Sequence, residues 1–465
     1  MNKENERAKL LSEESIGKLL LQFSVPAIIG MLVNALYNIV DRIFIGRGVN
    51  QLAIGGIFVG MPISLILMAF SMLIGIGGNT LVSIRLGQNR KEDAEKITGN
   101  SVVLLLLIST VISIVGLMFL EPLLKSFGAS ESNLQYAIDY MRIILYGAPF
   151  QALGFGMNNF IRGEGSPKIA MMTMLIGAIL NTILDPIFIF GFNMGVKGAA
   201  LATIISQAVS AIWVMKYFFG GNSMLKIKKE YLKLKSSIIK EIVSIGFAPF
   251  SMQLAASMVT ILLNNNLKNY GGGLATSSMG VIQSISMLIL MPMFGINQGA
   301  QPIIGFNYGA KHYDRVKETL KLAIIAATAI GIAGFAFTQL LPVTLFKLFI
   351  GSEGNIDEVV RMGVPGMRIY LAMLPIIGFQ VVSANYFQAI GKPKHAMFLS
   401  LSRQVLVIIP VLIILPKFLE LTGVWLAGPI SDIIASVITA YFVIKDLKTL
   451  GIENNPKLNN IIREN

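Results

Sequence analysis

The stretch Gly165-Ser166-Pro167-Lys168 returns later in the chain as Gly391-Lys392-Pro393-Lys394, and Met141-Arg142-Ile143 returns as Met367-Arg368-Ile369. The distance is the same for both pairs, from 165 to 391 and from 141 to 367. This period is close to half of the 465 residues. Solenoid repeats recur about every 20–50 residues. The sequence therefore predicts one large module that was duplicated.

The composition indicates a membrane protein. Hydrophobic residues make up 54% and charged residues 14% of the chain, with a mean hydropathy of +0.69. A soluble domain carries about 25% charged residues. The net charge of +13 could suggest nucleic acid, but the basic residues lie in short loops between apolar runs. That placement orients a chain in a bilayer, so we expect no nucleic-acid partner. The absence of cysteine excludes disulfides.

Twelve apolar runs are long enough to cross a bilayer as helices, since about 20 residues suffice. They lie near residues 20–45, 52–82, 97–120, 134–161, 169–191, 197–219, 239–268, 276–306, 318–341, 361–389, 395–417 and 422–445. Lysine and arginine concentrate in the loops after the even-numbered runs. By the positive-inside rule, both termini and these loops are cytoplasmic. We predict an all-α polytopic membrane protein in the cell's inner (plasma) membrane.

A polar, lysine-rich segment near mid-chain divides the spans into two sets of six. The predicted parts are a cytoplasmic N-terminus (1–19), an N-lobe (20–219), a cytoplasmic linker (220–238), a C-lobe (239–445) and a cytoplasmic C-terminus (446–465). Because six is even, both lobes enter from the same side. They should be related by a pseudo-twofold axis along the membrane normal, as in parallel-repeat transporters. Substrate sites in such folds lie between lobes near mid-membrane.

Neither an enzyme nor an ATP-driven pump is indicated. The chain has no GxxxxGK[ST] motif, no Ser/His/Asp grouping and no HExxH pattern. Its two histidines, His312 and His395, fall in predicted polar loops, and no metal-ligand cluster is present. Any transport must therefore use an ion gradient, and we expect no cofactor other than the coupling ion, H⁺ or Na⁺.

Two aspartates inside predicted spans are the strongest functional candidates. A charge deep in a bilayer costs at least about 2.5–3.5 kcal/mol, so few are retained without a role. Asp185 follows Asn181 by four residues and Asp41 follows Tyr37 by four, which places each pair on one helix face. Such carboxylates can carry a proton or, with nearby oxygens, hold Na⁺. The alternatives are that Asp41 pairs with Arg42 and that Asp185 caps a broken helix.

Other features of the spans allow two interpretations each. Asp432 and Arg403 form either a structural salt bridge or a functional pair. Asp139 lies three residues before Arg142 and is expected to pair with it. Pro26, matched by Pro249 in the second repeat, is either a hinge or a packing feature. Methionines crowd span eight, where Met287 and Met291 with Gln283 suit a promiscuous pocket, although methionine also fills ordinary membrane helices.

The chain resembles the multidrug and toxic compound extrusion (MATE) family over nearly its whole length. The most specific matches are Asn181-Thr182-Ile183-Leu184-Asp185-Pro186, Gly195-Val196-Lys197-Gly198-Ala199-Ala200, the paired Gly-x-Pro-Lys loops, and Tyr37-Asn38-Ile39-Val40-Asp41 with Gly46-Arg47-Gly48. The resemblance implies a V-shaped pair of six-helix lobes, a first helix that bends at Pro26, and cation-coupled efflux. It also implies an N-lobe cation site formed by Asp41, Asp185, Asn181, Tyr37, Tyr140, Asn158 and Thr203.

The match is nearest the bacterial MepA-like or DinF-like branch of that family. One departure is that spans seven, eight and ten carry no acid away from their ends, where some members carry a second site. We predict a monomeric antiporter that exchanges H⁺ or Na⁺ for organic, mostly cationic, compounds. The alternative is a flippase for lipid-linked oligosaccharides on a related fold. That function needs a cavity rich in arginine and lysine, and the predicted spans are poor in both away from their ends.

Overall fold

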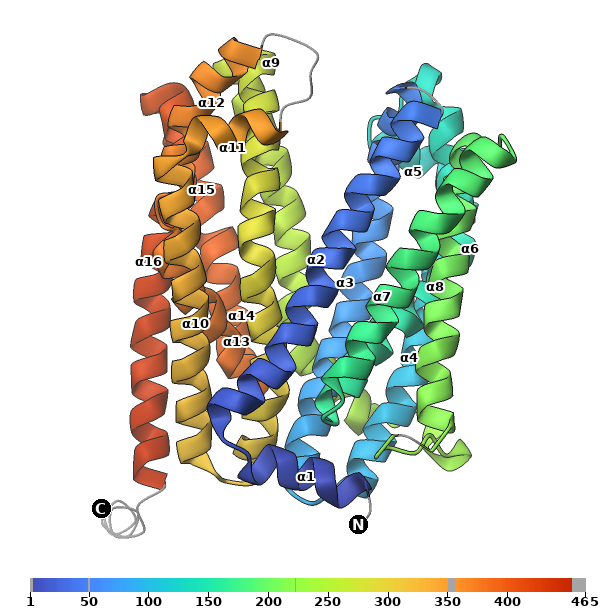
Figure 1. Cartoon of the computed structure of the whole chain (residues 1–465), viewed down its shortest axis with the longest axis vertical. Helices are drawn as coiled ribbons and strands as arrows, with labels where there is room; N and C mark the ends of the chain where they lie inside the picture. Colours follow the sequence, from blue (N-terminus) through green and yellow to red (C-terminus); the bar gives the residue numbers. More distant parts are fainter. Residues whose placement is uncertain (1–2, 49–50, 222, 350–355, 454–465) are drawn as a thin grey trace. The chain divides into compact units, whose positions relative to one another are not determined.

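The computed structural model describes residues 3–48, 51–221, 223–349 and 356–453, and within these ranges every regular element is helical (Figure 1). The α-helices are α1 (Lys3–Glu13), α2 (Ile16–Gly48), α3 (Gln51–Gly87), α4 (Lys91–Met118), α5 (Leu120–Ser126), α6 (Glu131–Gly163), α7 (Pro167–Pro186), α8 (Gly195–Phe219), α9 (Ser236–Gly309), α10 (Tyr313–Leu340), α11 (Pro342–Phe349), α12 (Ile356–Tyr370), α13 (Leu374–Ala389), α14 (Pro393–Leu401), α15 (Ile409–Ile414) and α16 (Pro416–Glu453). The π-helices are η1 (Ile187–Gly191) and η3 (Ser402–Ile408), and the 3-10 helix is η2 (Lys229–Leu232).

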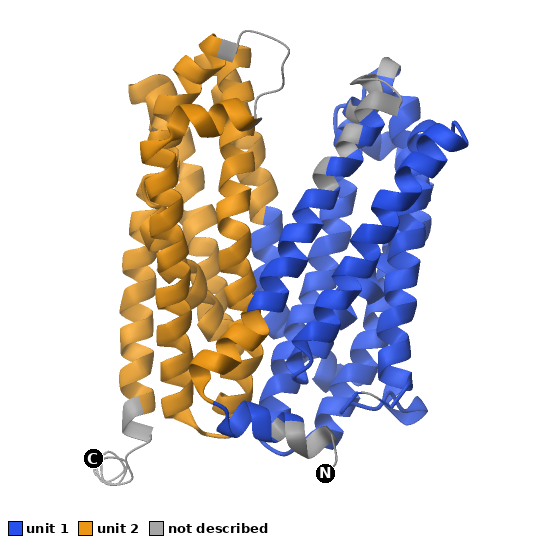
Figure 2. Cartoon of the chain, in the orientation of Figure 1, with its two compact units in different colours: residues 1–14, 25–254 blue, residues 15–24, 255–465 orange. Residues whose placement is uncertain are grey.

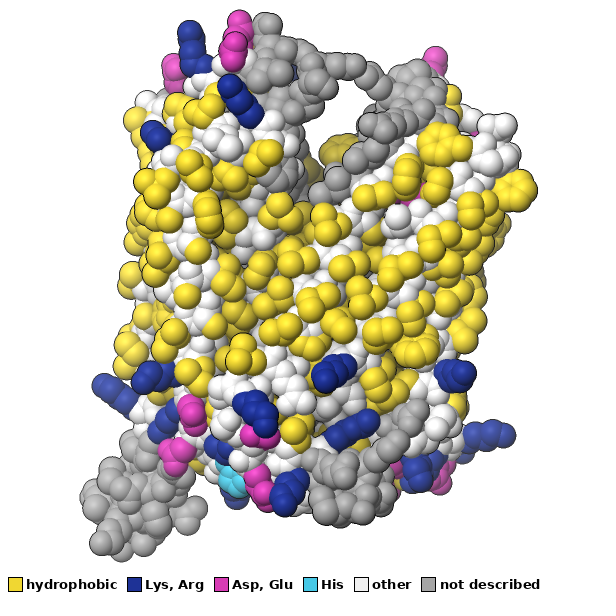
Figure 3. Space-filling view, in the orientation of Figure 1, with side chains coloured by type: hydrophobic (Ala, Val, Ile, Leu, Met, Phe, Trp, Pro, Cys, Tyr) yellow, Lys and Arg dark blue, Asp and Glu magenta, His cyan; other side chains and the backbone are white. Residues whose placement is uncertain are grey.

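Helix α4 shows how the sequence produces a membrane span. Its first turn carries Glu92 and Asp93, which interact favourably with the positive end of the helix dipole. An almost uninterrupted apolar stretch follows, and its outward-facing side chains include Leu107, Val111 and Ile114. Exposed apolar side chains are unfavourable in water but suit the bilayer interior. Figure 3 shows such side chains over the middle of the visible face, with lysine and arginine toward its ends.

The described helices account for all twelve predicted spans. Nine helices are long and apolar enough to cross a membrane, and a tenth span is the bent pair Asp357–Tyr370 and Leu374–Ala389, whose two parts meet at 49°. Helix α9 contains two spans, because its path breaks at Gly272, where φ is 66° and ψ −158°. Helix α6 has the length of the remaining span, although it carries charged residues. The all-α polytopic fold predicted from hydropathy is confirmed.

The chain forms two compact units (Figure 2). Unit 1 contains residues 1–14 and 25–254, and unit 2 contains residues 15–24 and 255–465. The linker and the first turns of α9, up to residue 254, therefore belong to unit 1, and the first turns of α2 belong to unit 2. The lobe boundaries inferred from the sequence stay a prediction.

Two glycines explain why α9 begins in unit 1. A Cβ atom on Gly246 would overlap the carbonyl oxygen of Leu73, and one on Gly77 would overlap that of Ile242. The backbones of α3 and of the first turns of α9 are therefore in direct contact. No residue with a side chain fits either position without movement of a helix. This contact fixes the start of α9 within unit 1.

Candidate functional site

Helix α7 places Asp185 and Asn181 in the interior of unit 1. Both side chains are buried, and Asn181 Nδ2 donates to Asp185 Oδ1 at 3.3 Å, as their spacing of four residues predicts. The regular α-helix ends at Pro186, and the chain continues as the π-helix η1. Proline removes one backbone hydrogen bond, and π-segments are frequent at functional sites. The chain therefore changes from α to π geometry after Pro186 but stays helical, so the alternative in which Asp185 caps a broken helix is not supported.

Helix α2 brings Asp41 to the same place. The carboxyl groups of Asp41 and Asp185 lie close enough to interact electrostatically. Two negative charges that lie close together repel each other, so the state with both carboxyl groups ionised is disfavoured. The side chain of Arg42 lies outside the described residues, so the alternative pairing of Asp41 with Arg42 stays a prediction.

Three further side chains complete the polar cluster, which we call the aspartate site. Tyr140 of α6 is hydrogen-bonded to Thr203 of α8 and lies close enough to Asp41, Tyr37 and Asp185 to interact with them electrostatically. Thr203 Oγ1 in turn is 3.5 Å from Asn181 Nδ2. The site thus joins α2, α6, α7 and α8 and consists of Tyr37, Asp41, Tyr140, Asn181, Asp185 and Thr203.

Asn158 is the one predicted member that the structure does not bring into these contacts. It is buried on α6, five helical turns after Tyr140, which corresponds to about 27 Å along a regular helix. Its role in cation binding stays an inference from the family resemblance.

The donor set of the aspartate site suits a small hard cation or a proton. Asp185 Oδ2 and Asn181 Oδ1 are buried and have no hydrogen-bond partner among the described residues. Buried polar atoms normally have partners, so these two oxygens are suited to bind a cation. Carboxylate and amide oxygens are typical of hard cations rather than of thiolate- or imidazole-bound metals. Within the described part of the chain, no group of three or more His, Cys, Asp or Glu side chains forms a metal site.

An apolar groove lies beside the aspartate site, between α2 and α7. Its volume is about 230 Å³, and its lining residues are Val33, Leu36, Tyr37, Val40, Ala178, Ile179, Thr182 and Ile183. Tyr37 belongs to both the groove and the site. The groove is therefore a place where an apolar molecule could reach the carboxylates.

The predicted substrate residues of span eight lie in unit 2. Gln283, Met287 and Met291 follow one another at intervals of four on the second half of α9, so they share one helix face. Gln283 and Met287 are exposed. Their role in substrate binding stays a prediction, as does the hinge role of Pro26, which lies inside α2.

Two charged pairs proposed from the sequence have different outcomes. Arg403 and Asp432 do pair, with Nε of the arginine 2.6 Å from Oδ1 of the aspartate. The pairing of Asp139 with Arg142 is wrong, because Asp139 forms an ion pair with Lys197 at 3.4 Å and Arg142 is exposed. Helix α8 begins two residues before Lys197, and its first turn reaches Asp139 more readily than the outward-facing arginine does.

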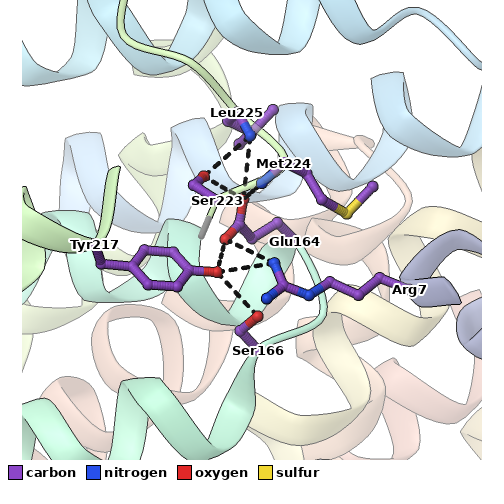
Figure 4. A network of polar contacts seen from close by, with 7 residues as sticks. All are labelled: Arg7, Glu164, Ser166, Tyr217, Ser223, Met224 and Leu225. Atoms are coloured by element: carbon purple, nitrogen blue, oxygen red, sulfur yellow. Dashed lines mark hydrogen bonds and ion pairs between the residues drawn. The ribbon is translucent and has the colours of Figure 1, made fainter. Parts of the chain in front are cut away.

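A second polar cluster, centred on Glu164, was not anticipated from the sequence (Figure 4). Glu164 lies between α6 and α7 and is fully buried. Its Oε2 accepts hydrogen bonds from Ser223 Oγ at 2.6 Å, Met224 N at 2.9 Å and Leu225 N at 3.3 Å. Its Oε1 accepts from the hydroxyl of Tyr217 and lies 3.4 Å from Arg7 of α1. One carboxyl group thus joins the N-terminal helix, α8 and the linker.

Comparison of the two sequence repeats could have identified Glu164 as unusual. Residue 164 corresponds to Ile390 at the repeat distance, so the acid is a departure from an apolar position. In the folded protein, burial raises the pKa of Glu164 from 4.5 to about 7, against the lowering effect of Ser223, Tyr217 and Arg7.

Glu164→Gln is expected to remove a pH dependence of stability. A carboxyl whose pKa is higher in the folded than in the unfolded state binds its proton more tightly when folded. The free energy of unfolding of the wild type should therefore fall as pH rises from about 4.5 to about 7, by up to about 3 kcal/mol. Thermal unfolding in detergent across this pH range measures the slope. The variant should show a flatter one.

The control for this experiment is Glu230→Gln, at an exposed position of the linker. It should keep the wild-type slope. Equal slopes in Glu164→Gln and wild type would contradict the assignment of the titration to Glu164.

Comparisons with known proteins identify the family of the chain. The MatE family model matches residues 26–187 and 249–414, one segment in each repeat. The multidrug export protein MepA of Staphylococcus haemolyticus is 29% identical over 94% of this chain and 96% of its own length. MepA of Staphylococcus aureus (strain MSSA476) is 28% identical over 90% of this chain and 92% of its own.

Solved structures give the same result. An outward-facing multidrug resistance MATE family transporter of the MOP superfamily superposes with a TM-score of 0.90 at 26% identity, covering 96% of this chain and 98% of that one. The MATE multidrug transporter DinF-BH, solved in complex with a ligand, has a TM-score of 0.86 at 41% identity, covering 93% and 96%. Since the family model covers most of both repeats, the chain belongs to the MatE family of multidrug efflux transporters and is a multi-pass membrane transporter, not an enzyme.

Proposed function

We propose that the protein is a secondary antiporter that exchanges H⁺ or Na⁺ for organic, mostly cationic, compounds. The observation that carries this proposal is the close approach of Asp41 and Asp185, two carboxyl groups from different membrane helices. Intramembrane acids in transporters commonly form proton or ion sites. Neutral oxygens from Asn181 and Thr203 accompany them, so the same site suits either coupling ion.

Charge on the aspartate site would link the ion to the drug. Binding of H⁺ removes the negative charge of a carboxylate, and binding of Na⁺ compensates it. In both cases the site attracts an organic cation less strongly. When the ion leaves, the carboxylates attract such a cation from the neighbouring groove. Each ligand shifts the transport cycle only by its different affinity for the two conformations. The coupling ion and the organic cation must therefore compete for the same negative charge. Asp41 and Asp185 supply this charge.

Helix α2 would transmit the occupancy of the site. Asp41 lies on the part of α2 that belongs to unit 1, whereas residues 15–24 of the same helix belong to unit 2. The change of unit occurs between Ser24 and Val25, next to Pro26. A proline removes a backbone hydrogen bond and eases bending at that point. This position supports Pro26 as the hinge.

The chemistry of the substrates follows from the relatives and the charges. MepA proteins are named multidrug export proteins, and DinF-BH is named a multidrug transporter. We infer that this protein likewise exports varied organic compounds, and that the aspartates favour cations. Basic residues between the even- and odd-numbered spans support cytoplasmic termini in the inner membrane. We further propose that the transporter acts as a monomer with no cofactor besides its coupling ion.

Efflux driven by separate gradients distinguishes H⁺ from Na⁺. Transport of a cationic dye in proteoliposomes is measured under three conditions: with a pH gradient alone, with a Na⁺ gradient alone, and with both. Asp41→Asn is expected to reduce the response to whichever gradient drives the wild type, by about tenfold or more, because the site loses one of its two carboxylates. Dye fluorescence measures this. An undiminished response in Asp41→Asn would exclude Asp41 from coupling.

A further inference from the structure

The linker between α8 and α9 is held against unit 1 over most of its length. At its start, Glu164 accepts hydrogen bonds from Ser223, Met224 and Leu225, as described above. Further along, buried Glu95 of α4 accepts from the backbone nitrogen of Lys226 at 3.2 Å. Glu95 also forms an ion pair with Lys228 at 2.9 Å. Two buried carboxyl groups thus fix the first half of the linker.

Asn100 of α4 fixes the second half. Its Nδ2 donates to the carbonyl oxygens of Tyr231 at 3.0 Å and Lys233 at 3.3 Å, and its Oδ1 accepts from the backbone nitrogen of Lys235 at 2.8 Å. The approach is close, since a Cβ on Gly99 would lie 2.7 Å from the Tyr231 carbonyl. We call residues 223–235 the linker strap. Its backbone conformation is set by side chains of unit 1.

The strap presents lysines outward. Lys229, Lys233 and Lys235 are exposed, and none of them forms an ion pair among the described residues. Two exposed apolar side chains accompany them, Leu234 within the strap and Phe219 at the end of α8. Basic and apolar side chains on one segment are typical of surfaces at the membrane interface.

We propose that the linker strap is a binding surface for the anionic headgroups of phospholipids in the cytoplasmic leaflet. The strap connects the ends of two membrane-spanning helices, so it lies where the spans leave the hydrocarbon. Anionic lipids attract each lysine near the surface, strengthening binding by about fivefold per residue. Because Glu164, Glu95 and Asn100 already order the backbone, binding does not have to order it. The surface serves lipid contact and is independent of the aspartate site.

Spin-labelled lipids test the proposal without any measurement of transport. The full-length protein is reconstituted in phosphatidylcholine vesicles with a trace of spin-labelled phosphatidylglycerol or phosphatidylcholine, and the motionally restricted fraction of each label gives the lipid preference. We expect the wild type to prefer phosphatidylglycerol. The triple variant Lys229→Gln, Lys233→Gln, Lys235→Gln should lose this preference by about threefold or more. Added salt should weaken the preference in the wild type.

The matched control neutralises three other exposed lysines, which lie at the start of α7, between α9 and α10, and at the start of α14: Lys168→Gln, Lys311→Gln and Lys394→Gln. It should keep most of the preference. An equal loss in the control would assign the effect to net charge and overturn the strap as a specific surface. No loss in the strap variant would overturn the proposal outright. Displacement of the labelled lipid by a short oligonucleotide at equal charge concentration would indicate a nucleic-acid surface instead.

A further variant distinguishes the contribution of the lysine charges from that of the ordered backbone of the linker strap. Asn100→Leu keeps every lysine and removes the contacts to Tyr231, Lys233 and Lys235. The preference should fall, though by less than in the triple variant. An unchanged preference would show that the tied backbone is not needed.

Discussion

Replacing Asp185 by Asn is expected to abolish the dependence of drug accumulation on the ion gradient. Asparagine preserves the size of the side chain and its hydrogen-bonding capacity toward Asn181, but it can neither release a proton nor carry the charge that attracts a cation. Each coupled proton allows about a tenfold concentration ratio per pH unit of gradient. The dye ratio reached in proteoliposomes should therefore fall by about tenfold or more under a one-unit gradient.

Asp139→Asn is the control, because Asp139 is another acid within a membrane helix. It forms an ion pair with Lys197 and accepts a hydrogen bond from Gln135, and neither partner belongs to the aspartate site. This variant should accumulate dye as the wild type does. If Asp185→Asn also reached the wild-type ratio, the assignment of coupling to Asp185 would fail.

Removing one partner of the Arg403–Asp432 pair should strongly destabilise unit 2. In Arg403→Met, the carboxylate of Asp432, whose side chain is only 4% exposed, would stay buried without its counter-charge. Breaking a buried pair in this way costs about 3–5 kcal/mol. The unfolding temperature in detergent should fall accordingly. The double variant Arg403→Met, Asp432→Leu removes both charges and should recover most of the loss.

This experiment also decides between the two interpretations of the pair. A structural salt bridge predicts that the stable double variant still exports dye. A functional pair predicts a stable double variant without efflux. Failure of the double variant to recover stability would contradict both, because it would show that the loss comes from packing rather than from an unpaired charge.

The number and position of the membrane helices could be predicted because each span is a local property of composition. The place at which α9 passes from one unit to the other could not. It depends on the contact of Gly77 and Gly246, which lie far apart in the sequence, and on helices that change unit along their length. Hydropathy detects a span but carries no information about its neighbours.

The two polar clusters differ in the same way in how far the sequence predicts them. Asp41 and Asp185 stand out because acids within spans are rare, and the spacing of Asn181 and Asp185 gives their contact directly. Glu164 resembles an ordinary loop charge, since its burial is produced by Arg7, Tyr217 and the linker. The pairing of Asp139 failed for the same reason. Helical spacing permits a local partner, but a residue from another helix can take that place.

The tied linker has a consequence for how two copies of one module became a single chain. A cut within the linker strap would leave both new ends attached to unit 1, through Glu164 on one side and Asn100 on the other. The polar segment that looks like the natural seam is therefore part of the first copy. Gene halves separated at this segment would not correspond to the halves of the folded protein.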